Sequence, residues 1–436
     1  MAWIRGTGLT AFGRLPGRDA LGWQASAATL AMTDAGVRPQ DIDGLVVGYA
    51  TTMNHLMPAN LLAEHLGITP AVAFGVAVGG ATGLAMVAQA TALVDAGAAS
   101  TVLVVAGEDR ASGQSTQAST ATLAQVGHHR YEVPVGATVP QYYALLASAY
   151  LHEFGLTPSD GLAPLAVAMR THAARHDGAQ FRRPVTVDDV GASRVVADPL
   201  HLLDCCPVSD GGAAVVVGAA GSGRDVEIVG TGQAHLHQHV SEADLHGFGA
   251  RVSAGRALAA ADTALDELDV VGIYDSFTIT LALLLEELGL APPGRAGAAA
   301  AEGWFDLGGP VPVNPHGGLL SRCRRRDGPP RGGGHAVARR GARAPGPGCP
   351  AGTRPCRRGR DVGARDGGPA WPGRDGMTDD WTDGEPRIVV SVCDDCGHCW
   401  YLRRERCPRC AGSASPTIAA GAGTVVAATA GDRGAI

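Results

Sequence analysis

Short runs of Val, Ile and Leu alternate along the chain with Ala-rich stretches whose apolar residues recur at helical spacing. Residues 45–47 and 102–105 are continuous Leu/Val runs, which predict buried strands. Residues 21–35, 81–96 and 164–175 have the spacing of amphipathic helices. This alternation favours a layered α/β fold.

The longest uncharged stretch is residues 66–94, which is rich in Ala. Pro70, Gly75, Gly79, Gly80 and Gly83 interrupt it, so it predicts a buried strand, a turn and a helix, and not a membrane span.

Two pairs of segments far apart in the chain share a pattern. Residues 4–8 (Ile-Arg-Gly-Thr-Gly) recur at 228–232 as Ile-Val-Gly-Thr-Gly, an offset of 224. Residues 42–47 (Ile-Asp-Gly-Leu-Val-Val) are matched at an offset of 226 by residues 268–273 (Leu-Asp-Val-Val-Gly-Ile). Both members of the second pair follow an Ala-rich helical stretch. Two matches in the same order predict a duplicated domain.

The composition excludes several classes of protein. With 436 residues, 45% of them hydrophobic, the chain can bury a large core and form two to three domains. All 35 basic residues are Arg, so no Lys is available for a Schiff base or a phosphate loop. A net charge of −7 and 5% aromatic residues argue against nucleic-acid binding. The chain has no basic and apolar leader, and its ten Cys fit a reducing compartment, so a cytoplasmic location is expected.

The composition changes abruptly at residue 322. Residues 322–376 contain 14 Arg, 14 Gly and 8 Pro but no Leu, Ile, Met, Phe or Tyr, a mixture that cannot form a core. With four Asp, the segment has a net charge of +10, so the rest of the chain has a net charge of −17. Two interpretations stay open: a disordered basic linker, or a shift of reading frame in a GC-rich gene. The shift is favoured because the change falls within a motif described below. Residues 377–380 (Met-Thr-Asp-Asp) then resemble the start of a second protein.

Two Cys-x-x-Cys knuckles lie near the end of the chain. Ten residues separate Cys393 and Cys396 from Cys407 and Cys410. This spacing lets four thiolates surround one Zn²⁺ tetrahedrally and leaves no open position, which indicates a structural site. His398 and Cys399 are spare donors, interpreted as loop residues beside the metal.

Over residues 1–321 the chain resembles the thiolase superfamily, and within it the sterol-carrier and lipid-transfer branch. The resemblance rests on five segments in the family's order. They are Val-Gly-Gly-Ala-Thr-Gly (78–83), Met-Arg-Thr-His-Ala (169–173), Leu-Leu-Asp-Cys-Cys-Pro-Val-Ser-Asp-Gly-Gly-Ala-Ala (202–214), Tyr-Asp-Ser-Phe-Thr (274–278) and Asn-Pro-His-Gly-Gly-Leu-Leu-Ser (314–321). The resemblance implies a duplicated βαβαβαββ domain, in agreement with the repeat.

The resemblance places the reaction centre at Gly80. In thiolases of this family the residue at this position is the nucleophilic Cys, at the N-terminus of a helix whose dipole lowers the pKa of the thiol. Gly80 offers no thiol, so acyl-enzyme chemistry is not expected. Together with Thr82 and Gly83 it is expected to line the substrate site, with room for a branched substrate. Cys205 and Cys206 belong to another motif and are interpreted as core residues.

The remaining site residues follow from the two later motifs. Tyr274 stands where many relatives carry His or Asn, and a phenol there can donate to an oxyanion or exchange a proton with a hydroxyl; a core Tyr is an equally open interpretation. Asp275 is interpreted as a loop anchor more than as a base. His316 is a candidate catalytic imidazole, and Gly317 and Gly318 are expected to shape the thioester site.

Gly80 and Tyr274 together resemble the lipid-transfer-type aldolases, which lack the Cys and cleave tertiary β-hydroxyacyl-CoA thioesters beside a zinc-ribbon/OB-fold partner. Residues 377–436 resemble such a partner, cut short. The leading hypothesis is therefore aldol-type cleavage of a β-hydroxyacyl-CoA with a steroid or lipid side chain. An acyl-CoA acyltransferase and a non-catalytic acyl-CoA or lipid-binding subunit remain alternatives. The resemblance also implies a homodimer.

In the family a further active-site segment, with Gly-His-Pro or a Tyr, follows Ser321 almost at once, but here the chain continues Arg-Cys-Arg. We therefore predict a first half at 1–220, an incomplete second half at 221–321, the Arg/Gly/Pro segment at 322–376, and a zinc ribbon with the start of an OB-fold at 377–436. The chain as it stands is expected to be inactive or poorly folded.

Overall fold

The computed structural model describes residues 1–219, 224–242, 244–322, 389–400, 406–407, 409–418, 430–431 and 434–435. The Arg/Gly/Pro segment, apart from Arg322, and the predicted boundary at 376 lie outside the described residues. Within the described part, no helix combines the length and the apolar character needed to cross a membrane. The uncharged stretch at 66–94 forms a strand, a turn and a helix, as predicted.

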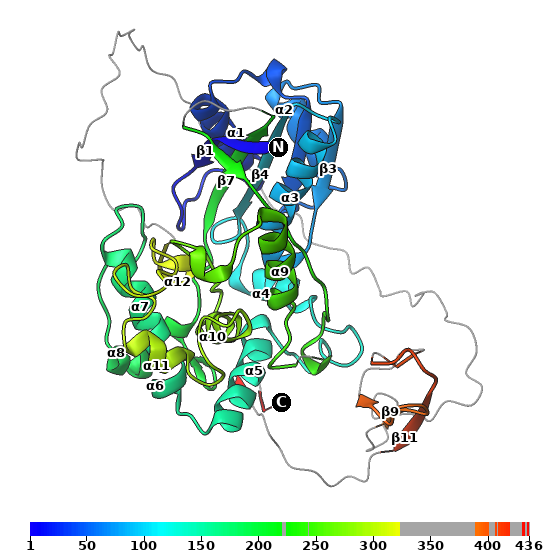
Figure 1. The fold of residues 1–436 in the computed structure, drawn as a ribbon, viewed down its shortest axis with the longest axis vertical. Coiled ribbons are helices and arrows are strands. Elements are labelled where there is room, and N and C mark those ends of the chain that lie inside the picture. The colour runs from blue at the N-terminus through cyan, green and yellow to red at the C-terminus, as the bar shows by residue number, and fades with distance from the viewer. Residues whose placement is uncertain are drawn as a thin grey trace, which may run out of the picture.

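Five strands of the first half and β8 of the second half form a mixed sheet of six strands in the order β3-β2-β4-β7-β1-β8 (Figure 1). β2 pairs in parallel with β3 and β4, whereas β7 runs antiparallel to both β4 and β1. β8 is antiparallel to β1 at one edge. The strands are β1 (Ala2–Leu9), β2 (Gly44–Gly48), β3 (Val72–Val76), β4 (Thr101–Asp109), β7 (Asp210–Gly218) and β8 (Val226–Ile228).

Helices cover both faces of this sheet because its central strands are apolar on both sides. Leu45 of β2 and Leu103 of β4 pack under α1 and α2, while Val46 and Val104 pack under α3. This alternation is the two-residue period of a strand. The helices are α1 (Ala20–Ala35), α2 (Pro58–Leu66) and α3 (Thr82–Asp95).

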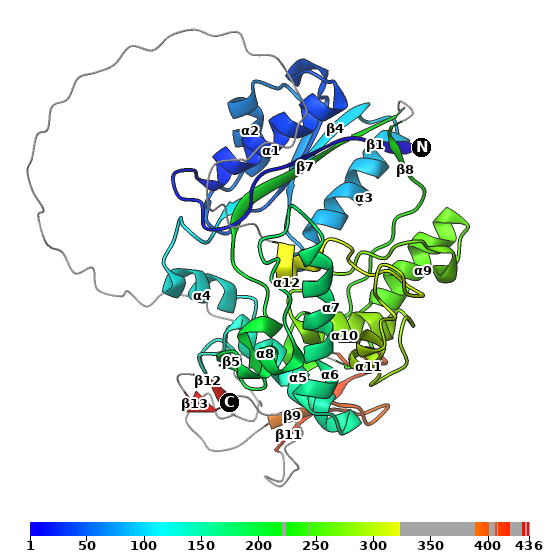
Figure 2. The ribbon, with the colours of Figure 1, turned by 90° about the vertical axis from the view of Figure 1, so that its left-hand side faces the viewer.

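A second, mainly helical core lies at the other end of the molecule (Figure 2). It joins residues 144–200, inserted before β7, with residues 271–320 of the second half. Glu286 lies within this core and accepts hydrogen bonds from the Tyr150 hydroxyl and from the backbone N–H groups of Gly294 and Ala296. The elements of this region are α4 (Thr116–Ala124), α5 (Val139–Phe154), α6 (Pro158–Gly161), α7 (Ala163–Ala174), α8 (Val187–Ala192), β5 (Val195–Ala197), β6 (Leu200–His201), α10 (Thr278–Glu287), α11 (Ala296–Ala301) and α12 (Gly318–Arg322).

The predicted duplication is confirmed by a shared contact between strand and helix. Gly8 of β1 lies so close to α1 that a Cβ would collide with the carbonyl oxygen of Ala27. Gly232, which follows β8, lies equally close to Ser253 of α9 (Ala250–Ala261). Only glycine permits such an approach of two backbones. The helix positions are offset by 226, as the second sequence match predicts.

The described part of the second half contains few strand pairings. β8 pairs with the first-half strand β1, and a single parallel bridge joins Val271 to Val313. Between them lie α9 and the short 3₁₀ helix η5 (Leu265–Glu267). Near the end of the chain, β9 (Val389–Cys393) lies between β10 (Cys399–Trp400) and β11 (Ala414–Ile418) in an antiparallel sheet, and β12 (Ala430–Gly431) pairs with β13 (Gly434–Ala435).

Candidate active site

Gly80 and Tyr274, which are 194 positions apart in the chain, meet at the carboxyl end of β3. Gly80 lies in a 3₁₀ turn, η2 (Gly79–Ala81), directly before α3. A Cβ atom on residue 80 would lie 2.5 Å from Cζ and 2.8 Å from the hydroxyl oxygen of Tyr274, distances that real Cβ atoms do not show. The phenol therefore fills the space that a side chain at position 80 would occupy, and the expectation of room there for a branched substrate is wrong. A Cys at 80 and this Tyr conformer exclude each other.

Tyr274 is accessible and protonated. The residue keeps 40% of its surface exposed, so a ligand can reach it. Partial burial raises the pKa of Tyr274 to about 12, and the neighbouring Tyr143 and Cys206 add to the rise. At neutral pH the resting phenol is a hydrogen-bond donor.

Tyr143 of α5 is a second phenol in the same cluster, and sequence reasoning missed it. Its ring stacks on Phe277 with centroids 4.4 Å apart. Burial raises the pKa of Tyr143 as well, and Ser276 opposes the rise for both tyrosines. Ser276 Oγ lies 3.3 Å from Thr280 Oγ1. The only signal in the sequence is Gln-Tyr-Tyr at 141–143 in a helical stretch, a pattern typical of core residues.

Thr82 and Gly83 have different surroundings. The Thr82 hydroxyl donates to the Gly79 carbonyl (2.6 Å) and accepts from the Val78 N–H (3.0 Å), which closes the turn around Gly80. A Cβ on Gly83 would meet nothing within 4 Å. Thr82 therefore shapes the loop, whereas Gly83 faces open space.

Asp275 ties the Tyr274 segment to the loop that carries His316. Its carboxylate is 1% exposed and accepts hydrogen bonds from the N–H groups of Leu319 (2.7 Å) and Leu320 (3.4 Å). Burial raises the pKa of Asp275 to about 7, and the two N–H groups oppose the rise. A Cβ on Gly318 would collide with this carboxylate. The geometry supports the interpretation of Asp275 as a loop anchor.

The His316 loop is built on two positive-φ glycines. Gly317 and Gly318 have φ of 93° and 62°, and a Cβ on Gly317 would lie 2.5 Å from Ala173 of α7. The Gly318 N–H donates to His316 Nδ1 (3.1 Å), so the proton of the neutral imidazole resides on Nε2. His316 thus presents a donor.

The segments 271–276 and 314–320 are clamped together by Asn314. Its side chain accepts from the Ile273 N–H and donates to the Ile273 carbonyl, both at 2.8 Å. The fully buried His172 of α7 contacts the Asn314 carbonyl oxygen through Nδ1 (3.3 Å). Arg170 Nε donates to the Ser321 hydroxyl (3.0 Å). Through these contacts, the Met-Arg-Thr-His-Ala motif at 169–173 holds both ends of the loop at 314–321.

The acidic and thiol groups of residues 202–214 are structural. Burial raises the pKa of the Cys205 thiol, which donates to the His201 carbonyl (3.3 Å). Asp210 is fully buried and accepts N–H groups of Leu15, Ala111 and Ser112. Neither residue offers an activated nucleophile.

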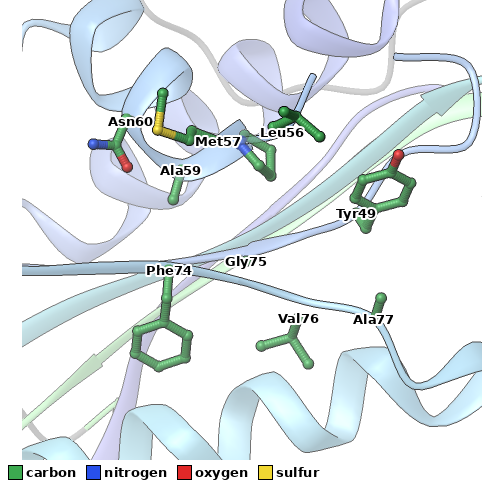
Figure 3. A pocket seen from close by; sticks show the side chains of 10 residues that line it. Tyr49, Leu56, Met57, Ala59, Asn60, Phe74, Gly75, Val76 and Ala77 are labelled. Carbon is green, nitrogen blue, oxygen red and sulfur yellow. The ribbon is translucent and has the colours of Figure 1, made fainter. Parts of the chain in front are cut away.

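A surface hollow opens on the other side of β3, between this strand and the start of α2 (Figure 3). Figure 3 shows Met57 and Ala59 on one side of the strand at Gly75 and the side chains of Phe74 and Val76 on the other. Neither Gly80, Tyr274 nor His316 lines it. The hollow is therefore separate from the Gly80–Tyr274 site.

The four cysteines of the two knuckles converge. Their sulfur atoms all lie within 4.8 Å of one another, with Cys393 and Cys410 3.4 Å apart and Cys396 and Cys407 3.7 Å apart. Zinc–sulfur bonds of about 2.3 Å in a tetrahedron require sulfurs about 3.8 Å apart. These residues fit a zinc ion, which would hold β9 to the second knuckle and stabilise this small sheet. Within the described residues no other group of three or more ligand atoms converges in this way, and the group does not include His128, His129, His398 or Cys399.

Family models match nearly the whole of the first 326 residues. Residues 4–220 match the model described as thiolase, N-terminal domain, and residues 232–326 match the model described as thiolase C-terminal domain-like. The chain belongs to the thiolase family. The thiolase fold accounts for the mixed sheet and for the internal repeat, as predicted.

Three similar proteins bear on the chemistry of this thiolase-family chain. It is 34% identical to a steroid side-chain-cleaving aldolase of Thermomonospora curvata, over 73% of this chain and 85% of that protein. It is 33% identical to the 17-hydroxy-3-oxo-4-pregnene-20-carboxyl-CoA lyase of Mycobacterium tuberculosis (73% and 86% covered) and 31% identical to an acetyl-CoA acetyltransferase of Methanothermobacter thermautotrophicus (73% and 85%). A solved structure described as an Ltp2-ChsH2(DUF35) aldolase superposes with a TM-score of 0.62 at 32% identity, covering 74% of this chain and 85% of that one.

Proposed function

We propose that this protein makes or breaks a C–C bond in a β-hydroxyacyl-CoA thioester by an aldol-type route, with a steroid or lipid side chain as the acyl group. The observation that carries the proposal is the Tyr274 phenol in the space of a residue-80 side chain. The aldolase and the lyase among the similar proteins support it.

Cleavage requires one proton to leave and another to arrive. The β-hydroxyl loses its proton, the C–C bond breaks, and the electron pair moves through the α-carbon into the thioester carbonyl as an enolate. A proton then adds to the α-carbon, giving a ketone or aldehyde and a shortened acyl-CoA. Because the phenol is protonated at rest, Tyr274 is the acid that gives its proton to the α-carbon. The proton released by the β-hydroxyl passes to solvent water, and the phenolate takes a proton back from water before the next turnover.

The His316 loop is the second component of the proposed site. An enolate places negative charge on the thioester oxygen, and hydrogen-bond donors fixed in advance stabilise such charge. His316 Nε2–H is the donor that we assign to this oxygen. Gly317 and Gly318 let the backbone approach it, and Asp275 holds the loop in place.

Thiolase-type acyl transfer is the alternative within the same fold, and an acetyltransferase is among the similar proteins. That reaction needs an activated thiol. Gly80 supplies none, and the raised pKa of Cys205 disfavours its thiolate. A non-catalytic acyl-CoA-binding subunit is the alternative of another class.

The Tyr274→Phe variant separates an aldolase from a binder. We expect turnover of a tertiary β-hydroxyacyl-CoA to fall about 10²- to 10⁴-fold, with the dissociation constant changed by less than about threefold. The matched control is Tyr142→Phe, on the neighbouring residue whose hydroxyl donates to the Ala124 carbonyl. Equal turnover in Tyr274→Phe and the parent protein contradicts the role of Tyr274.

Several further assignments complete the proposal. Zinc is the structural ion of the four-cysteine site, and the substrate is a CoA thioester. We place the domain boundaries at residues 220, 321 and 376. We also place the protein in the cytoplasm. A second copy pairs through the edge strand β3, beside which Leu56 and Met57 are exposed, and a zinc-ribbon/OB-fold subunit associates with the assembly.

A further inference from the structure

The inner face of α9 lacks the cover that its counterpart α1 has. α1 buries seven residues, whereas α9 buries none. Both helices dock on a glycine pair of the preceding strand and end in a residue of left-handed conformation, Gly36 and Asp262. The two helices are therefore equivalent in local structure and differ in what packs against them.

The strand counterparts differ in the same way. All five residues of β2 are buried. At an offset of 226, residues 270–274 alternate: Val271 and Ile273 are 8% exposed, but Val270 is 52% exposed. Val229, beside β8, is 59% exposed. Val229 and Val270 therefore lack cover among the described residues, whereas Val271 and Ile273 belong to the helical core.

The first half shows which elements provide this cover. β4 and β7 lie between β2 and β1, and α1 packs against both. By the same offset, the counterpart of β4 would begin at residue 327. Residues 327–335 read Asp-Gly-Pro-Pro-Arg-Gly-Gly-Gly-His and contain no apolar strand residue.

We propose that the gap bounded by residues 226–232 and 270–274, with α9 behind it, is a docking surface for two antiparallel Val- and Ala-rich strands carried by a separate polypeptide. We call it the strand gap. Added strands would gain backbone hydrogen bonds along the exposed edges and would bury the α9 face.

Two observations favour this occupant. Glu287 of α10 accepts the N–H groups of Phe248, Gly249 and Arg251, so the start of α9 is held in place although no sheet of the described residues lies behind it. Beyond residue 322, the apolar strand β9 already pairs with β10 and β11 on its two edges. Of the remaining printed residues, 419–429 form an Ala/Val-rich stretch, and a stretch of this length can supply one strand where two are needed.

The test uses the full chain and a synthetic hairpin in which residues 101–109 are joined through Asn-Gly to residues 210–218. Asp109 and Asp210 are paired in the sheet, so a two-residue turn connects the strands in their native register. The measured quantity is hydrogen exchange of the α9 amides, Ala250–Ala261. We expect the hairpin to slow exchange by at least about tenfold. The β1 and α1 amides should not change.

A matched pair of variants tests whether the hairpin occupies the strand gap. Leu258 is the counterpart of Met32 on the inner face of α1, whereas Ala259 is the counterpart of the exposed Thr33. Leu258→Asp should abolish the protection, and Ala259→Asp should preserve it. Because a free hairpin can fail to fold, a second protein carries it covalently in place of residues 323–388.

Two results would overturn the proposal. One is α9 exchange as slow as that of α1 in the chain alone, which would mean that residues of this chain fill the gap; a deletion of residues 418–430 would then restore fast exchange. The other is unchanged α9 exchange in both the mixture and the covalent protein. Neither outcome depends on catalysis, so this proposal and the proposed function fail separately.

Discussion

The two halves of this thiolase-family chain share their local structure but differ in burial. In each half a strand with two close-packed glycines leads into a helix, a left-handed residue and a 3₁₀ turn whose carboxylate caps its own N-terminus, Asp41 in one and Glu267 in the other. Within the described residues, α1 is covered by neighbouring strands and α9 is not. Local sequence therefore determines the shape of these elements, whereas strands distant in sequence determine their burial.

The active-site Tyr also arises from a difference between the halves. At an offset of 226, Tyr274 corresponds to Gly48, the last residue of β2. Gly80 and Tyr274 are complementary: each half supplies one partner, and the side chain missing from the first half is replaced in space by the phenol from the second.

The largest expected effect compares Met32→Ala with Leu258→Ala. Met32 is 5% exposed, so its truncation should lower the free energy of unfolding by about 2–5 kcal/mol. Leu258 lacks strand cover, and its truncation should cost less than about 1 kcal/mol. Denaturant unfolding of both variants measures the difference. Equal losses would mean that the second half is as well packed as the first.

Asp275 gives the second half a pH dependence of stability. Its folded-state pKa of about 7 lies above the ordinary value of 3.8, so the native protein binds the proton more tightly than the unfolded chain. Stability should therefore fall as pH rises from about 4 to 7, by on the order of 2–4 kcal/mol. Asp275→Asn should flatten this slope in unfolding curves measured across that range. An unchanged slope would assign the effect to another group.

The paired glycines should respond unequally to a β-branched residue. In Gly8→Val, the added side chain pushes β1 away from α1, and β1 belongs to a complete sheet that cannot move freely. The free energy of unfolding should fall by about 1–3 kcal/mol. Gly232→Val should cost less, since α9 can move outward. Melting temperatures of the two variants, compared with the parent, test this ranking. A larger loss for Gly232→Val would show that α9 is tightly held.

The smallest effect concerns the two 3₁₀ caps. The Arg38 side chain lowers the pKa of Asp41 to about 2, and a hydrogen bond from the Ala264 N–H lowers the pKa of Glu267. A carboxylate whose pKa is lowered by folding stabilises the protein at pH values above its ordinary pKa. This stabilisation is lost as the pH falls through the folded-state pKa. Asp41→Asn should therefore slightly reduce stability near neutral pH and weaken its decline between about pH 4 and 2. Glu267→Gln should have a similar effect at acid pH.

Strands, helices, the repeat and the four-cysteine cluster could be predicted because each depends on residues close in sequence or on an internal match. The contact between Gly80 and Tyr274 could not, because its 2.5 Å approach depends on how the two halves pack. The sequence suggested a loop anchor at Asp275, but it could not predict the partners Leu319 and Leu320. Tyr143 escaped notice because a buried Tyr on a helix has no pattern that separates it from the core.

The most direct test of the central claim is the dependence of C–C cleavage on free CoA. The full chain, alone and with the strand hairpin, is incubated with a tertiary β-hydroxyacyl-CoA, and the products are identified by mass spectrometry. The account predicts one carbonyl fragment and one shortened acyl-CoA in the absence of free CoA, with loss of both products in Tyr274→Phe. Two acyl-CoA products formed from a β-ketoacyl-CoA and free CoA while the β-hydroxyacyl-CoA stays intact, or tight binding without any product, would contradict it.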